Sequence, residues 1–385
     1  MEGTAQTGGP GIRAVDSPMG KTWVITGYDL ALRVFGDSDT FANAVFRSKF
    51  LAVGQVPRTE PDGTPTQTLA SDPPIHTRIR RLVSNAFTAR RVESMRPGME
   101  KLATELIQKM LDAGPGADLY PALALPLPST IICRLLGVPE SDVPAFRGWS
   151  DTLVQTADTA DLDTVRAAKN AMEEYFTELI ALRQREPEDS LLSELIHKRD
   201  TDDALTTSEL QGLAQVILLA GLETTVNQIG VGVVWLLSRP EHWERTVADP
   251  GLIPATVEEL LRIEPVAGDG LPGVPRYTTR AVELGGHTIP SDTIIWVDTA
   301  QANLDEAKFA CPHAFDLNRG ANQHLAFGHG IHHCLGAHLA RVQVQTVFAK
   351  LVEMVPALRL AVDPGELTIT SGTAVRGYRH IPVAW

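Results

Sequence analysis

The side chains best suited to binding a metal are concentrated in the stretch AFGHGIHHCLGAH at positions 326–338. This stretch holds Cys334 and four histidines, and His324 lies just before it. A structural zinc site needs four ligands, which usually come from two paired units such as Cys-x-x-Cys or His-x-x-x-His. Cys334 and His338 could form one such unit, but no second unit of this kind occurs in the chain. The alternative is a site in which the cysteine alone binds the metal.

Glycines lie on both sides of Cys334, at Gly328, Gly330 and Gly336. Glycine tolerates positive φ and lets the backbone approach a large flat group closely. The residues at 335–355 have the apolar spacing of a helix, which places Cys334 at or near the N-terminus of that helix. The helix dipole and the free N–H groups there favour a thiolate over a thiol. The stretch therefore predicts a negatively charged sulfur prepared to bind iron.

Five positions around the cysteine, Phe327, Gly330, His332, Cys334 and Gly336, match the pattern Phe-x-x-Gly-x-(His/Arg)-x-Cys-x-Gly. By this pattern the chain resembles the cytochrome P-450 superfamily, the haem-thiolate monooxygenases. The resemblance implies a haem b cofactor (iron protoporphyrin IX) with Cys334 as the axial iron ligand. It also implies that Phe327 packs beside the sulfur and that His332 hydrogen-bonds a haem propionate. The remaining histidines of the stretch are expected at the surface or behind the metal ligand.

Cations for the two haem propionates are expected from distant parts of the chain, because a buried carboxylate needs a partner. The stretch DPPIHTRIRRLVSNAF at 72–87 resembles the family's helix near the haem edge. The resemblance implies that His76 and Arg80 hold propionates, and their spacing of four places both on one helical face. It gives the same role to Arg276. A solvated basic helix is the alternative reading of the stretch.

The segment LLAGLETTVNQ at 218–228 places an acid and an alcohol, Glu223 and Thr224, in the middle of a long apolar pattern. Gly221, after Ala220, costs about 1 kcal/mol relative to alanine, and a threonine can bond back to a carbonyl one turn earlier, so a local kink is expected. The resemblance implies that the kink makes room for dioxygen, that Thr224 positions a water and that Glu223 relays protons from solvent. A core threonine is the alternative.

The segment EELLR contains Glu259 and Arg262, three residues apart on one helical face. As a surface ion pair this spacing would contribute only about 0.3 kcal/mol. The resemblance instead implies a buried Glu-x-x-Arg pair that holds the loop before the cysteine through a further arginine, Arg319. Its role would be structural.

The elements that must position these residues are mostly helical. Thr206 and Glu209 form a capping box that begins a helix of about thirty residues, ending before Pro240. The first dozen residues are expected to be frayed, and residues 52–71 to form a long loop. The fold class is therefore mainly α with small β-sheets (α+β), and the resemblance implies a cytochrome P-450 fold with the long helix over the haem and the cysteine loop beneath it. We expect one domain over 1–385, helix-rich at about 74–265 and 334–355 and β-rich at about 20–30, 275–300 and 358–385.

Composition excludes several classes of function. The net charge of −13 argues against nucleic acid as a partner. Three scattered cysteines do not make a disulfide framework, and with no leader-like start this favours the cytoplasm. The most apolar region, 216–237, is interrupted by Glu223 and Asn227, so no membrane span is expected.

The resemblance implies a soluble bacterial enzyme that takes electrons from a separate ferredoxin or flavodoxin. Arg78, Arg81, Arg90 and Arg91 could form a basic docking patch for that acidic carrier. Dioxygen and a hydrophobic small molecule would be the substrates, in the hydroxylation or oxidative coupling of a natural product. Segments AGDGLPGVPR and PVAW vaguely resemble members that act on cyclic dipeptides.

The substrate pocket is expected to be lined from loops near residues 45–71, 153–164 and 266–274, with apolar side chains at Val53, Val56, Leu69, Leu153 and Val266. Two other functions stay open. A noncatalytic haem-binding sensor or carrier would have no use for the acid and alcohol pair. A zinc hydrolase would need a general base beside its metal, and no Glu or Asp lies near Cys334 in sequence.

Overall fold

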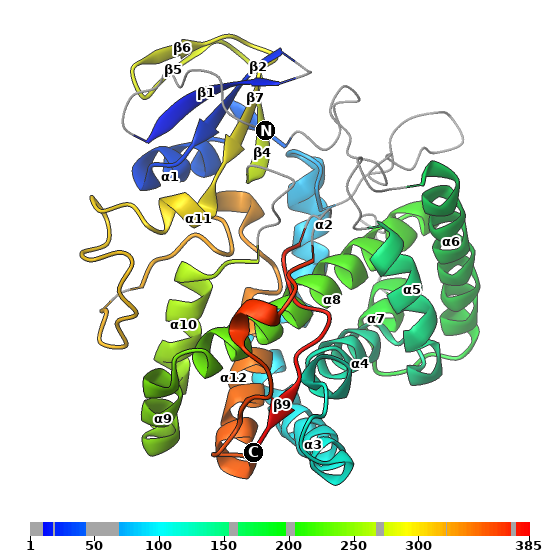
Figure 1. The fold of residues 1–385 in the computed structure, drawn as a ribbon. Coiled ribbons are helices and arrows are strands. Elements are labelled where there is room, and N and C mark those ends of the chain that lie inside the picture. The colour runs from blue at the N-terminus through cyan, green and yellow to red at the C-terminus, as the bar shows by residue number, and fades with distance from the viewer. Residues whose placement is uncertain are drawn as a thin grey trace.

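The computed structural model describes residues 11–17, 20–43, 69–153, 161–197, 205–266, 273–320, 322–370 and 375–385. Helices make up most of this part of the chain, and the sheets are small, as the sequence predicts (Figure 1). The α-helices are α1 (Tyr28–Gly36), α2 (Ile75–Val83), α3 (Ala89–Ala113), α4 (Pro126–Leu136), α5 (Val143–Leu153), α6 (Leu162–Arg185), α7 (Leu191–His197), α8 (Thr207–Leu237), α9 (Pro240–Ala248), α10 (Ile253–Ile263), α11 (Thr299–Ala302) and α12 (Ala337–Met354).

The largest sheet has five strands in the order β1-β2-β7-β4-β3. Strands β2 and β7 run parallel, with Trp23 opposite Ile295, and the other pairs are antiparallel. Two two-stranded sheets, β5 with β6 and β8 with β9, complete the β structure of the described residues. The strands are β1 (Ile12–Ser17), β2 (Gly20–Ile25), β3 (Phe41–Ala42), β4 (Val274–Thr278), β5 (Val282–Leu284), β6 (His287–Ile289), β7 (Ile294–Val297), β8 (Arg359–Leu360) and β9 (Val383–Ala384).

Two separate apolar cores correspond to the helical and the β-rich parts. The larger core surrounds α8 and draws on helices α2 to α10 and α12, whereas Ala302 of α11 belongs to the smaller core. The smaller core lies where α1 packs against the five-stranded sheet, with Phe35 and Ile295 among its buried members. Figure 1 shows the sheet and α1 together at the upper left, away from α3 to α7. Alternating apolar residues in β1, β2 and β7 and the apolar stripe of α1 account for this small core.

Helix α8 runs through the middle of the molecule (Figure 1). The predicted capping box is present: Glu209 N–H donates to Thr206 Oγ1 at 3.1 Å and Thr206 N–H donates to Glu209 Oε2 at 2.8 Å. The helix is apolar on all sides, as expected for a helix enclosed by protein. By length and composition alone it could cross a membrane, but 72% of its most apolar window is buried. It is therefore the central core helix.

Most of the N-terminal stretch expected to be frayed, residues 1–10, lies outside the described part, and Ile12 already begins strand β1, which pairs with β2 over six residues. In the C-terminal segment expected to be β-rich, the described residues between 358 and 385 contain β8, β9 and isolated bridges such as Ile369 with Tyr378. Of the predicted loop at 52–71, residues 52–68 lie outside the described part.

Candidate functional site

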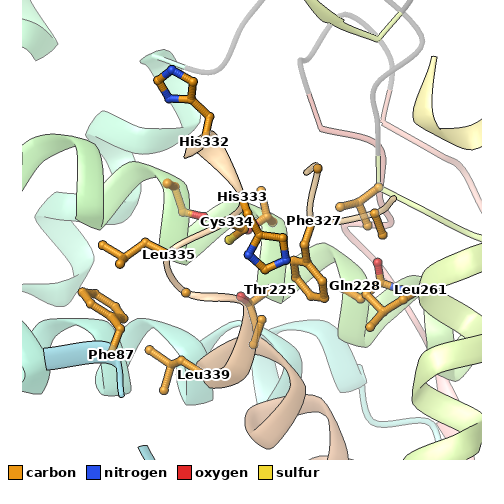
Figure 2. A pocket seen from close by; sticks show the side chains of 18 of the residues that line it. Phe87, Thr225, Gln228, Leu261, Phe327, His332, His333, Cys334, Leu335 and Leu339 are labelled. Carbon is orange, nitrogen blue, oxygen red and sulfur yellow. Dashed lines mark hydrogen bonds between the residues drawn. The ribbon is translucent and has the colours of Figure 1, made fainter. Parts of the chain in front are cut away.

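A cavity of about 510 Å³ lies between α8 and the loop that precedes α12. Its lining is mostly apolar and comes from α8, α10, α12, β4 and the cysteine loop. Thr224 and Cys334 both line it. This volume and apolar character are typical of a small-molecule or cofactor site. Figure 2 shows Cys334 between Phe327 and Leu335, with His332 at the far end of the loop.

The backbone of the cysteine loop depends on two of the three predicted glycines. Gly328 and Gly330 have φ of +68° and +72°, and a Cβ on Gly330 would overlap the carbonyl oxygen of Phe35 in α1. Gly336 differs from the expectation, because it is the N-cap of α12 with an ordinary φ of −86°. It lines the cavity, and a Cβ there would meet no protein atom of the described residues within 4 Å.

The Cys334 side chain is accessible from the cavity but surrounded by protein. Its N–H donates to the carbonyl of Phe327 at 2.9 Å, and both side chains line the cavity; packing of the phenyl ring beside the sulfur stays a prediction. Burial raises the pKa of the Cys334 thiol, although the N–H of Gly336 and the charges of Arg80 and Arg341 lower it. The thiolate expected from the helix end stays a prediction. Cys334 precedes the N-cap Gly336 of α12, and a bound cationic metal would itself favour the thiolate.

Four basic side chains from three separate segments gather at one edge of the cavity: His76, Arg80, Arg276 and His332. His76 is 2% exposed, and neither of its ring nitrogens has a hydrogen-bond partner among the described residues. Its ring centroid lies 4.2 Å from that of His332, whose Nε2 is likewise buried and unpaired among those residues. Arg80 donates from Nη2 to the carbonyl of His333 at 2.7 Å, and so joins α2 to the cysteine loop.

The electrostatics of this basic cluster favour an anion. Burial lowers the pKa of Arg276 to about 10. Burial, followed by the charges of His76, Arg276 and Arg80, lowers the pKa of His332 to about 3. Burial also lowers the pKa of His76. The two guanidinium groups stay positive, and carboxylates placed beside them and beside the unpaired imidazoles would be stabilised by charge-assisted hydrogen bonds. The cluster therefore fits the propionate groups of the haem that the sequence predicts.

Glu223 and Thr224 are neighbours in α8 but point in different directions, because successive helical residues are about 100° apart. Thr224 faces the cavity, and its Oγ1 donates to the carbonyl of Ala220 at 2.7 Å, the back-bond predicted from the sequence. Glu223 is 1% exposed and accepts from Asn227 Nδ2 at 3.3 Å. The helix is continuous through this segment, and the kink stays a prediction. A Cβ on Gly221 would lie 2.8 Å from Ile132, so close packing against α4 is one reason for glycine there.

The Glu-x-x-Arg group is buried and fully bonded, as the sequence predicts. Arg262 Nη2 donates to Glu259 Oε2 at 2.6 Å, and Arg319 Nε donates to Glu259 Oε1 at 2.7 Å. Arg262 also donates to the carbonyls of Asn303, Pro312 and Ala314. The pair therefore holds the segment that precedes the cysteine loop, and its position away from the cavity lining agrees with a structural role.

The other sequence-derived residues have mixed outcomes. Leu69 and Val266 line the cavity, whereas Leu153 packs against the helical core; Val53 and Val56 lie outside the described residues. In the proposed docking patch, Arg78 pairs with Glu209, and Arg91 pairs with Glu194 at 2.8 Å. Part of the charge of this patch is therefore balanced by carboxylates within the protein.

A zinc site is not supported by the described residues, which contain no group of three or more His, Cys, Asp or Glu side chains arranged to hold a metal. His338 instead bonds Glu93 at 3.1 Å, and His324 bonds Glu258 at 3.1 Å.

Sequence reasoning missed several polar residues around the site. Thr225 and Gln228 also line the cavity, and helical spacing from Thr224 was the available signal. Arg379, Asp151 and Tyr120 lie near Glu223 but far from it in sequence. No local pattern points to them.

Comparisons with known proteins agree with this geometry. The family model "Cytochrome P450" matches residues 12–357. The mycinamicin IV hydroxylase/epoxidase of Micromonospora griseorubida is 40% identical over 97% of this chain and 92% of its own length. The monooxygenase PikC of Streptomyces venezuelae is 40% identical over 98% and 88%. The crystal structure of SgvP, which is involved in the tailoring step of griseoviridin, superposes with a TM-score of 0.88 at 38% identity, covering 98% of this chain and 93% of that one.

Proposed function

Because the chain belongs to the cytochrome P450 family, we propose that it uses dioxygen and a Cys334-ligated haem to oxidise a hydrophobic small molecule in the tailoring of a natural product. The protein is an oxidoreductase of the monooxygenase type, and its cofactor is haem, iron protoporphyrin IX. When bound, the haem supplies the iron at which dioxygen is reduced and split. The observation that carries the proposal is one cavity that joins Cys334, Thr224 and a partly unpaired basic cluster.

Residues of this chain would hold the haem at two places. The Cys334 sulfur binds the iron, with Phe327 packed beside it. His76, Arg80, Arg276 and His332 hold the propionates, because their buried and unpaired nitrogens need acceptors. Gly330 and Gly336 let the backbone of the cysteine loop approach the haem closely. Ala220 and Gly221 have small side chains, so α8 leaves space above the haem.

Thr224 and Glu223 deliver protons to the cavity. The Thr224 hydroxyl faces the cavity and positions a water, and the Glu223 carboxyl behind it relays a proton toward that water. General acid catalysis of this kind contributes about 10²- to 10⁴-fold to rate. A noncatalytic haem carrier would have no need for these two residues, which favours the enzyme.

The substrate is expected to be bulky and apolar, since apolar side chains dominate the cavity lining. One relative is a mycinamicin IV hydroxylase/epoxidase, so mycinamicin IV is the first substrate to test. Hydroxylation is the favoured reaction; oxidative coupling, with cyclic dipeptides as a substrate, stays a prediction.

Electrons would come from a separate ferredoxin or flavodoxin in the cytoplasm. Arg81 and Arg90 are exposed, and together with Arg78 and Arg91 they would form the docking patch. We propose no nucleic acid partner and one domain over residues 1–385.

A carbon monoxide difference spectrum tests the proposal. The reduced protein under carbon monoxide should absorb at the wavelength from which the family takes its name. Cys334→Ala should remove this band, while the matched change Cys311→Ala, at an exposed cysteine outside the cavity lining, should leave it intact. A protein that binds no haem, or that keeps the band without Cys334, would refute the proposal.

A further inference from the structure

The carboxyl group of Glu223 lies in a buried polar cluster built from four elements. We call Glu223, Asp151, Arg379 and Tyr120 the relay cluster. Glu223 comes from α8, Asp151 from α5, Tyr120 from the π-helical turn Tyr120–Ala124, and Arg379 from the C-terminal segment. In Figure 1 the red C-terminal segment runs alongside α8.

Arg379 bridges the two carboxyl groups. Its Nη1 lies 2.9 Å from Asp151 Oδ1, and its Nη2 lies 3.7 Å from Glu223 Oε2. Nη1 also donates to Tyr120 Oη at 2.5 Å. The C-terminal segment is fixed closely against α8, because a Cβ on Gly377 would overlap Oδ1 of Asn227. The guanidinium is therefore held at a defined position between α5 and α8.

Exposure rises along the cluster from the cavity side outward. The Glu223 side chain is 2% exposed, whereas those of Arg379 and Asp151 are 31% and 38% exposed. The cluster thus joins a buried carboxyl beside the cavity to a carboxyl in contact with solvent. Thr224, the neighbour of Glu223 in α8, lines the cavity itself.

Hydrogen bonding in the cluster is incomplete unless the carboxyl groups share a proton. Glu223 Oε1 is buried without a hydrogen-bond donor among the described residues, and Asp151 Oδ1, although it lies 2.9 Å from Arg379 Nη1, accepts no well-aligned hydrogen bond there. A proton on one carboxyl group supplies that donor. Burial raises the pKa of Glu223, Arg379 lowers it, and the charge and hydrogen bonding of Asp151 raise it. Arg147 adds a second positive charge. Its Nε lies 3.8 Å from Asp151 Oδ2, and its guanidinium group lies over the ring of Tyr120.

We propose that Asp151 takes up protons from solvent and passes them to Glu223, with Arg379 as the positioning residue that holds the two carboxyl groups together. Each transfer moves one proton: Asp151 gains it from solvent, gives it to Glu223, and Glu223 gives it to the water held by Thr224. No electron moves along this path, since electrons come from the redox partner. The inference rests on the proposed role of Glu223 in proton delivery.

The first test reads the carboxyl groups directly by infrared spectroscopy of the resting holoenzyme across a pH series. The C=O band of a protonated carboxyl group should be present and should disappear in Glu223→Gln. In Arg379→Gln the band should persist to a pH at least about one unit higher, because the stabilising positive charge is gone. Arg379→Lys keeps the charge and should restore the original titration. A band that is unmoved in Asp151→Asn and Arg379→Gln would overturn the proposal.

The second test measures the rate of oxygen consumption by the holoenzyme, with electrons supplied by a plant-type ferredoxin and its reductase. The rate is divided by the amount of haem that shows the absorption band of the carbon monoxide complex. Asp151→Asn should slow proton-dependent oxygen reduction about ten- to hundredfold and enlarge its solvent isotope effect. Asp163→Asn, the same change in an exposed ion pair on α6, should match the unaltered protein.

The outcomes separate this inference from the proposed function. If Glu223→Gln slows the reaction and Asp151→Asn does not, the path through Asp151 is wrong while the role of Glu223 stands. If Glu223→Gln has no effect, the role of Glu223 itself fails. If Asp151→Asn slows the reaction without changing its solvent isotope effect, Asp151 is only structural and the inference is overturned.

Discussion

Two buried groups of charged residues differ in how completely their members are paired. In the Glu259, Arg262 and Arg319 group, both oxygens of one carboxylate accept from guanidinium groups, and carbonyls take the remaining donors. In the basic cluster at the cavity edge, His76 has no hydrogen-bond partner among the described residues, and Arg276 donates to its own neighbour Pro275. A fully bonded group serves stability, whereas an incompletely bonded one is suited to a ligand.

Breaking the paired group should have the largest effect. Glu259→Ala leaves two guanidinium groups without their shared counter-ion, one of them 0% exposed. We expect a loss of about 3–5 kcal/mol in the free energy of unfolding. Urea unfolding followed by circular dichroism measures it. A loss near zero would mean that complete pairing does not distinguish the two groups.

A second paired group, formed by Glu258, His324 and Arg341, is partly exposed, and its contribution to the free energy of unfolding should be lost in acid. Burial raises the pKa of Glu258, but hydrogen bonds from His324 and Arg341 outweigh it and lower the pKa to about 2. Because the folded-state pKa is depressed, the contribution is present above the ordinary pKa of 4.5 and is lost as pH falls toward 2. It amounts to about 3 kcal/mol at most. Glu258→Gln should flatten the unfolding free energy between these pH values; an unchanged slope would contradict the assignment.

Breaking the unpaired cluster should affect the ligand more than the fold. Arg276→Met removes a guanidinium that is 5% exposed, and the protein without haem should unfold at nearly the same or higher urea concentration. Haem should leave the variant about tenfold faster, because a charge-assisted bond to a propionate is lost. Transfer of haem to an excess of apomyoglobin gives the rate. A strongly destabilised haem-free variant would show that the cluster is structural.

The smallest effect should come from a pair that is well bonded but exposed. Arg134 Nε lies 2.6 Å from Glu140 Oε1, and both side chains are at least half exposed. Arg134→Gln should change the unfolding free energy by less than about 1 kcal/mol, because water replaces the contact. The same urea experiment provides the control for Glu259→Ala. A loss as large as that of Glu259→Ala would mean that pairing matters regardless of burial.

Much of the fold and of the site follows from local sequence signals. The capping box at Thr206 predicts the start of α8, because its two hydrogen bonds involve residues three apart. The spacing around Cys334 predicts a loop followed by a helix, since glycines and apolar periodicity act locally. The buried state of Glu259 came from the family resemblance, because the same spacing also suits a surface pair.

The rest depends on contacts between distant segments. Strand β2 pairs with β7, which comes much later in the chain, and burial by distant segments affects the thiol of Cys334. Arg379 meets Asp151 across more than half of the chain. Such partners are set by tertiary packing, and no periodicity or motif in the sequence encodes them.

The contact between Gly330 and Phe35 has a consequence for protein engineering. The loop that carries the metal-binding sulfur packs closely against the end of α1. The shape of the loop therefore depends on the N-terminal region, although the two are far apart in sequence. A chimaera made with a relative by a single crossover between α1 and the cysteine loop would take α1 from one parent and the loop from the other. Productive chimaeras should inherit both pieces from the same parent.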